Sequence, residues 1–179
     1  MHTYIALLRA VNVGGRTVHM ETLRDALTEL GLARVRTYIQ SGNVFFDYAK
    51  RDRAALTRSL EACLKDTFGF EIPVFLRTIP ELEAIVDADP FRGVRVTDDD
   101  RLSVIFLPSR PPKTLSLPMR SPKGDFELIG AGDAEIFAVW HLVNGRPPNP
   151  GVFLEKTLSV PTTARFFATT AKILEAARS

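Results

Sequence analysis

The sequence predicts an α+β protein of two subdomains, residues 1–78 and 79–179, packed together as one compact protein. The order of the segments and the composition support this prediction. Segments with strand-like alternation and segments with helical spacing follow one another in β-α-β-β-α-β order in the first half, and a second, less regular set follows. An apolar fraction of 45%, with 12 Phe among 179 residues, is enough for a core without disulfides.

The first two strands are predicted at residues 3–9 and 33–39, where β-branched and aromatic side chains alternate with others. A loop follows the first strand. Apolar residues then recur at helical spacing until Gly31, a natural helix stop; they are Met20, Leu23, Leu27 and Leu30.

A tight turn at residues 40–43 leads into a third strand at 44–48. A second helix follows and ends near Gly69, and a fourth strand is predicted at 73–77. This β-α-β-β-α-β order is that of the split βαβ, or ferredoxin-like, unit.

The second half is less regular but again mixes strands with helices. Residues 144–150 contain three prolines and are not expected to form regular structure, and the stretch that leads to Pro122 is poorly patterned. A second α+β unit is therefore predicted, with a degenerate copy of the first as one explanation. Its expected elements are a helix at 80–88, a strand at 102–107, a hairpin at 125–129 and 135–142, and helices at 153–158 and 163–177.

Topology predicts where the polar loops of the first half lie. In such a unit strands 1 and 2 are parallel and strand 3 runs antiparallel between them, so residues 9–16 and 40–43 share one sheet edge. The first helix also begins at that edge, where unpaired N–H groups favour anions. The predicted ligand-binding residues are Arg9, Asn12, Gly14, Gly15, Arg16, Gln40, Ser41, Gly42 and Asn43, with His19 close by.

Composition excludes several classes of function. A formal charge of +2 is too small for a basic arm that binds nucleic acid by counterion release alone, and a local basic patch stays open as an alternative. The single cysteine, Cys63, forms no intrachain disulfide, and no His, Cys, Asp or Glu group has metal-ligand spacing, so no metal or cofactor is implied. The amino terminus is interpreted as a strand rather than a signal peptide, and no long apolar run follows. A cytoplasmic protein is expected.

The first 45 residues closely resemble the domain of unknown function 1697 family. The residues that carry the resemblance are the segments 4–15 (YIALLRAVNVGG), 20–24 and 35–44 (VRTYIQSGNV). The segments 68–70, 90–91 and 160–165 are similar to the same family. The resemblance implies a two-subdomain α+β fold, found mainly in bacteria, and no established activity.

The C-terminal part departs from the family pattern at two segments. Members tend to have Gly-Arg-Ser-Lys-Leu where this chain has residues 145–149 (GRPPN), and Arg-Asn-Trp-Asn-Thr where it has 165–169 (RFFAT). Arg146 and Arg165 are retained and are predicted as second-half contributors to the site. If the missing side chains bind a ligand in other members, that half of the site is altered here.

Three functions remain open at this point. The first is a protein that binds a small anionic ligand at the 9–16/40–43 edge, and the structural alternative is a loop in which Asn12 bonds its own backbone. The second is an enzyme at the same edge, with Arg9 as electrophilic stabiliser and Ser41 or His19 in proton transfer. The third is a nucleic-acid module that presents aromatic residues, including Phe45 and Phe46, on its sheet face. An exposed Phe166 or Phe167 would mark a contact between copies of the chain.

Overall fold

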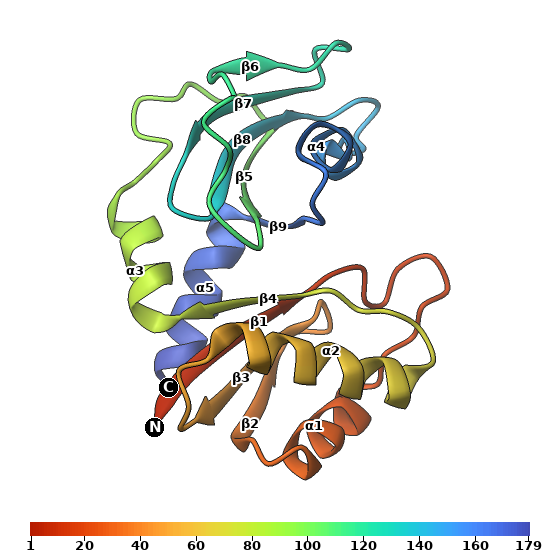
Figure 1. The fold of residues 1–179 in the computed structure, drawn as a ribbon. Coiled ribbons are helices and arrows are strands. Elements are labelled where there is room, and N and C mark those ends of the chain that lie inside the picture. The colour runs from red at the N-terminus through yellow and green to blue at the C-terminus, as the bar shows by residue number, and fades with distance from the viewer. The chain divides into compact units, whose positions relative to one another are not determined.

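The computed structural model describes residues 1–179, and the chain forms two compact units (Figure 1). Unit 1 comprises Met1–Leu82 and Ile173–Ser179, and unit 2 comprises Glu83–Lys172. The division differs from the expected subdomains 1–78 and 79–179 chiefly at the carboxyl end. The last seven residues belong to unit 1 because Arg36 donates hydrogen bonds to the carbonyl oxygens of Ala176 and Ala177.

Unit 1 contains the predicted β-α-β-β-α-β series. Its elements are β1 (His2–Leu8), α1 (Met20–Glu29), β2 (Ala33–Tyr38), β3 (Asn43–Tyr48), α2 (Arg53–Phe68) and β4 (Val74–Thr78). The strand order is β2-β3-β1-β4, with every neighbouring pair antiparallel. Strands β1 and β2 are therefore parallel and β3 lies between them, as predicted.

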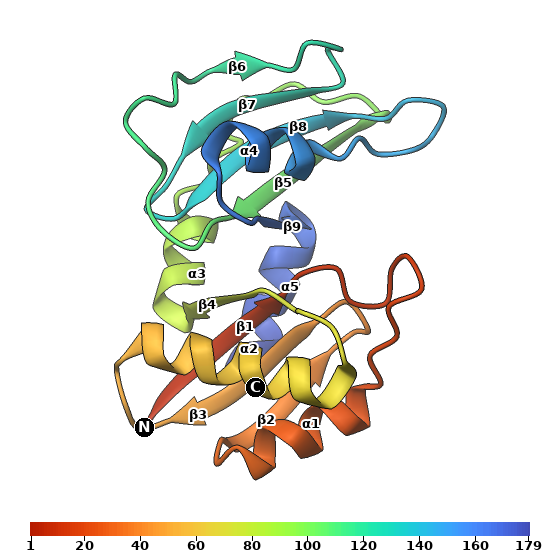
Figure 2. The same cartoon turned by 45° about the vertical axis from the view of Figure 1, so that its right-hand side comes forward.

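Helices α1 and α2 cover one face of this sheet (Figures 1 and 2). Alternate residues of the strands point toward them, because successive side chains of a strand face opposite sides. Buried residues that meet in this core include Tyr4, Leu8, Val44 and Phe46 from the strands and Leu23, Leu27, Leu56, Leu60 and Leu64 from the helices.

The boundaries of α2 follow from its capping residues. Asp52 precedes the helix and its carboxylate accepts a hydrogen bond from the Ala55 amide at 2.9 Å. Gly69 ends the helix in the left-handed conformation, with a φ of 80°. The helix α1 begins after His19, whose side chain makes no capping hydrogen bond.

Unit 2 contains an antiparallel sheet in the order β6-β7-β8-β5-β9. Its strands are β5 (Asp100–Phe106), β6 (Met119–Arg120), β7 (Phe126–Ala131), β8 (Glu135–His141) and β9 (Thr163–Phe166), and α4 spans Pro150–Leu158. The helices α3 (Ile79–Asp87) and α5 (Phe167–Arg178) each have residues in both units. None of the five helices has the length and apolar character needed to cross a membrane.

The predicted final helix at 163–177 was wrong at its start. Residues 163–166 form β9, because they pair with β5 in a register that places Phe166 opposite Ser103 and Thr163 opposite Phe106. The short strand β6 was also missed, since it lies in the poorly patterned stretch before Pro122 and depends on pairing with β7.

The two sheets share one arrangement of strands, although the chain connects them differently. Strands β7-β8-β5-β9 have the same order and mutual orientation as β4-β1-β3-β2. In both units a strand, a helix and a parallel strand follow in sequence: β1-α1-β2 and β8-α4-β9. Each strand-to-helix loop also has a turn with two positive-φ residues, at Val13–Arg16 and at Val143–Arg146. The second half is thus related to the first by strand arrangement, not by chain order.

Candidate functional site

The two polar loops of unit 1 lie side by side, as the topology predicted. The Leu8 amide donates to the Gly42 carbonyl at 2.7 Å, which joins the end of β1 to the β2–β3 turn. The side-chain amide of Asn12 donates from Nδ2 to the Gln40 carbonyl at 2.8 Å. Segments that are 28 residues apart in the chain therefore form one surface at this sheet edge.

Asn12 joins the parts of this surface through hydrogen bonds of its side chain. While Nδ2 holds Gln40, its Oδ1 accepts a hydrogen bond from the Val18 amide at 2.8 Å, just before α1. Its φ of 56° is in the left-handed region, which asparagine tolerates better than most residues. Both polar atoms of the side chain are thus used within the protein, and Asn12 acts as a positioning residue.

The glycines have two different roles here. A Cβ on Gly42 would lie 2.5 Å from Val11 Cγ2 and 2.9 Å from Leu8 Cβ, so the turn packs tightly against the segment that follows β1. Gly14 and Gly15 have φ values of 57° and 80° and open space around them, and they serve the turn conformation. Gly42, which was predicted to bind a ligand, is therefore in close contact with the protein itself.

Ser41 and Asn43 form the end of the β2–β3 turn. Asn43 is fully buried, and its Nδ2 donates to the Tyr38 carbonyl at 3.2 Å and to Ser41 Oγ at 3.0 Å. Ser41 is exposed but makes no hydrogen bond with His19. The Ser41–His19 dyad considered for an enzyme is therefore not formed.

The positive charges of the edge come from Arg9 and Arg16. The Arg9 side chain is half-buried and its backbone amide donates to the Pro73 carbonyl at 3.0 Å. Arg16 is exposed, with its guanidinium carbon 5.3 Å from the centre of the Phe70 ring, a cation–π contact that orients it. No Asp or Glu occurs in residues 9–19 or 39–43, so both loops are free of negative side chains.

The aromatic residues of β3 are not available for stacking on bases. Phe46 is 1% exposed and lies in the core with Tyr4, at 5.9 Å between ring centres. Phe45 is 2% exposed, with the Arg36 guanidinium 5.4 Å from its ring centre. The nucleic-acid interpretation required these rings to be exposed, and their burial contradicts it.

Arg146 and Arg165, the predicted second-half contributors, belong to unit 2. Arg146 is exposed on the turn that follows β8. Arg165 lies on β9, where its Nη1 donates to Thr163 Oγ1 at 3.0 Å and to the Ala164 carbonyl at 2.8 Å. Burial lowers the pKa of Arg165 to about 10, so it is still a cation at neutral pH.

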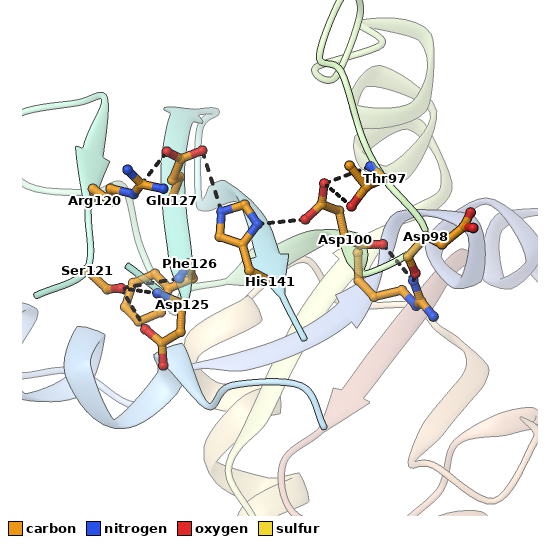
Figure 3. A network of polar contacts seen from close by, with 10 residues as sticks. Thr97, Asp98, Asp100, Arg120, Ser121, Asp125, Phe126, Glu127 and His141 are labelled. Atoms are coloured by element: carbon orange, nitrogen blue, oxygen red, sulfur yellow. Dashed lines mark hydrogen bonds and ion pairs between the residues drawn. The ribbon is translucent and has the colours of Figure 1, made fainter. Parts of the chain in front are cut away.

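A polar network in unit 2 was missed by sequence analysis (Figure 3). His141 Nδ1 lies 2.6 Å from Asp100 Oδ1, and Nε2 lies 3.7 Å from Glu127 Oε2, which is too long for a hydrogen bond. The Thr97 amide, followed by His141, lowers the pKa of Asp100. The β5–β8 register places Asp100 opposite His141, a relationship that strand alternation alone does not reveal.

This network joins side chains of neighbouring strands. Both ring nitrogens of His141 face carboxylates, and Nε2 is buried without a hydrogen bond. Because Nε2 is buried and Nδ1 lies next to Asp100, we interpret the network as a structural contact between neighbouring strands. No group of three or more His, Cys, Asp or Glu side chains in the structure is arranged to hold a metal ion.

The family of the chain follows from comparison with known proteins. Residues 1–137 match the family described as Protein of unknown function (DUF1697), and the chain belongs to that family. The departures at 145–149 and 165–169 fall outside the matched residues.

A solved structure of similar fold is that of the conserved bacterial protein SP0830 from Streptococcus pneumoniae. It is 26% identical to this chain with a TM-score of 0.72, and the match covers 100% of this chain and 99% of that one. No protein with a curated functional description matches the chain.

Proposed function

We propose that the chain binds a small anionic ligand, such as a phosphate or a carboxylate, at the loop edge formed by residues 9–16 and 40–43. The observation that carries the proposal is the pair of hydrogen bonds of Asn12, to Gln40 and to the amide of Val18, which join the two loops and the start of α1. A prearranged surface loses less conformational entropy when a ligand binds.

The charges of the edge favour an anion. Arg9 and Arg16 contribute two positive charges to loops that contain no carboxylate. The amino end of α1 adds backbone N–H groups and a partial positive charge, which attract anions. Glu21, in the first turn of α1, partly offsets this attraction.

A thermal-shift series tests the proposal. Inorganic phosphate, pyrophosphate and small carboxylates are added at constant ionic strength to the wild type and to Arg9→Gln, Arg16→Gln and Arg58→Gln. Arg58 is an exposed residue of α2, remote in sequence from both loops, and is the matched control. A ligand at 100 times its Kd adds about 2.7 kcal/mol, which raises Tm by about 10–20 °C for a domain of the size of unit 1.

The expected result is a rise in Tm that persists in Arg58→Gln and diminishes in both other variants. A rise of equal size in all four proteins would place the ligand elsewhere. No rise with any anion would remove the support for this function.

A further inference from the structure

A cavity of about 400 Å³ opens in unit 1 at the opposite end of the strands from the loop edge. It lies at the start of β1 and β2 and the end of β3, next to the last residues of α5. Its volume is in the range typical of small-molecule sites. We refer to it as the arginine pocket, because Arg34, Arg36 and Arg178 all line it.

The lining combines charge with apolar surface. Val35, Phe46, Ile79 and Ala177 contribute apolar atoms, and Asp47 is the one carboxylate side chain among the lining residues. Three arginines and one aspartate thus line the cavity, together with the polar residues Thr3 and Ser179. Sites that bind small molecules commonly have this composition, in which a few charged groups orient a ligand whose body rests on apolar side chains.

Arg34 and Asp47 form an ion pair at the pocket. Arg34 uses Nε and Nη2 to contact Asp47 Oδ2, while Thr3 donates to Asp47 Oδ1 at 2.8 Å. The Asp47 side chain is 4% exposed and that of Arg34 is 76% exposed, so the aspartate is deep and the arginine lies at the mouth. Because a guanidinium has five N–H donors, Arg34 keeps Nη1 for a further acceptor.

Arg36 provides a positive charge at the pocket that no carboxylate neutralises. Its Nη1 and Nη2 donate to the carbonyl oxygens of Ala176 and Ala177 at 3.2 and 3.3 Å, and it has no carboxylate partner. These bonds cap the end of α5, but a helix carboxyl end has only about half a negative charge. Capping therefore explains the orientation of Arg36 and leaves part of its charge unbalanced beside the cavity.

We propose that the arginine pocket binds a second class of ligand, a small carboxylate or phosphate that also has an apolar group. The anion is held by Arg36 and by Nη1 of Arg34, since guanidinium groups match the geometry of both anions. The apolar group rests on Ile79, which lines the cavity and is partly exposed. This inference is independent of the function proposed for the loop edge.

Calorimetric titration with matched probes tests this inference. Phenyl phosphate and benzoate share an aromatic ring and differ in the anion, and benzyl alcohol has the ring without a charge. Each probe is titrated into the wild type, Arg36→Gln, Arg34→Lys, Arg16→Gln and Arg58→Gln. Arg34→Lys retains a positive charge beside Asp47 but removes the planar guanidinium group with its several N–H donors. Arg16→Gln alters only the loop edge.

The expected result is that at least one anionic probe binds and benzyl alcohol does not. Arg36→Gln should weaken that binding by about tenfold or more, and Arg34→Lys should weaken it as well, whereas Arg16→Gln and Arg58→Gln should leave it unchanged. If Arg36→Gln fails to fold because α5 loses its cap, Arg34→Lys decides the question.

Three results would overturn the inference: no binding of either anion, unchanged affinity in the pocket variant that folds, or loss of affinity in Arg16→Gln. The last result would place the probe at the loop edge and support the proposed function instead. Loss of phosphate binding in Arg16→Gln together with intact probe binding would support both sites separately.

Discussion

The Nδ2 of Asn12 donates a hydrogen bond to the carbonyl oxygen of Gln40 at 2.8 Å, and this bond joins two loops that flank the same sheet edge. The opposite atom, Oδ1, holds the Val18 amide at the same distance. One side chain therefore determines how the β1–α1 loop, the β2–β3 turn and the start of α1 lie together.

Replacement of Asn12 should destabilise unit 1. Asn12→Ala removes both hydrogen bonds and places at a φ of 56° a residue that tolerates the left-handed conformation less well than asparagine, so we expect a loss of about 2–4 kcal/mol in the free energy of unfolding. Asn12→Gly removes the same bonds without the conformational strain and should lose less. Urea denaturation followed by circular dichroism measures both, and equal stability of the wild type and Asn12→Ala would show that the contact is not formed.

Gly42 and Gly69 provide a matched test of close packing. Both have φ values near 80°, but an added Cβ meets Val11 and Leu8 only at Gly42. Alanine should cost about 1 kcal/mol at Gly69 from backbone strain alone, and about 1–3 kcal/mol more at Gly42 from overpacking. Equal losses of stability in the two variants would contradict the tight contact between the β2–β3 turn and the segment after β1.

Asp47 should make the stability of unit 1 sensitive to acid. Burial raises its pKa, but the hydrogen bonds from Thr3 and Arg34 and the Arg34 charge together hold it below the ordinary 3.8. The folded pKa is thus below the unfolded one, so the stabilisation is complete above the unfolded pKa and is lost as pH falls through the folded pKa.

The corresponding measurement compares the wild type with Asp47→Asn between about pH 6 and pH 2. The difference in free energy of unfolding should be constant above about pH 5 and should shrink below about pH 4. Asp25→Asn, at an exposed position of α1, is the control. A difference that does not change with pH would mean that Asp47 is not preferentially ionised in the folded protein.

The Asp100–His141 pair should be energetically coupled. The His141 and Asp100 side chains are 29% and 11% exposed, so solvent screens their interaction only in part. A double-mutant cycle with alanine at both positions should give a coupling energy of about 1–2 kcal/mol. The exposed pair Arg110–Asp133, with side chains 76% and 89% exposed, should give less than about 0.5 kcal/mol in the same assay.

The fluorescence of Trp140 can be used to follow the unfolding of each variant in this cycle. It is the single tryptophan of the chain and lies on β8, next to His141 in unit 2. A coupling energy for Asp100–His141 no larger than that of Arg110–Asp133 would show that the network in Figure 3 contributes little to stability.

Much of unit 1 could be predicted from the sequence, because each of its elements has a pattern of its own and a local stop such as Gly69. The adjacency of the two loops then followed from topology. Strand β9 could not be predicted in this way, since residues 163–166 also fit a helical pattern and only pairing with β5, about sixty residues earlier, selects the strand.

The adjacency of the two loops that form the candidate site was predictable, and the contacts of their side chains were predictable only in part. Asn12 and Asn43 look alike in sequence as polar loop residues, yet the first joins two loops and the second is fully buried. The arginine pocket had no sequence signal, because it requires α5, at the carboxyl end, to reach Arg36 on β2. Contacts between segments so distant in sequence depend on the complete fold of unit 1.

The central claim is that the loop edge binds an anion, and amide NMR with inorganic phosphate tests it most directly. Phosphate is titrated into labelled protein, with sodium chloride of equal ionic strength as the reference. The account predicts saturable shifts at Gly14, Gly15 and Arg16, and about tenfold weaker binding in Arg16→Gln. Shifts that do not saturate, that match those in chloride, or that appear only near Thr3 and Val35 at the arginine pocket would contradict it.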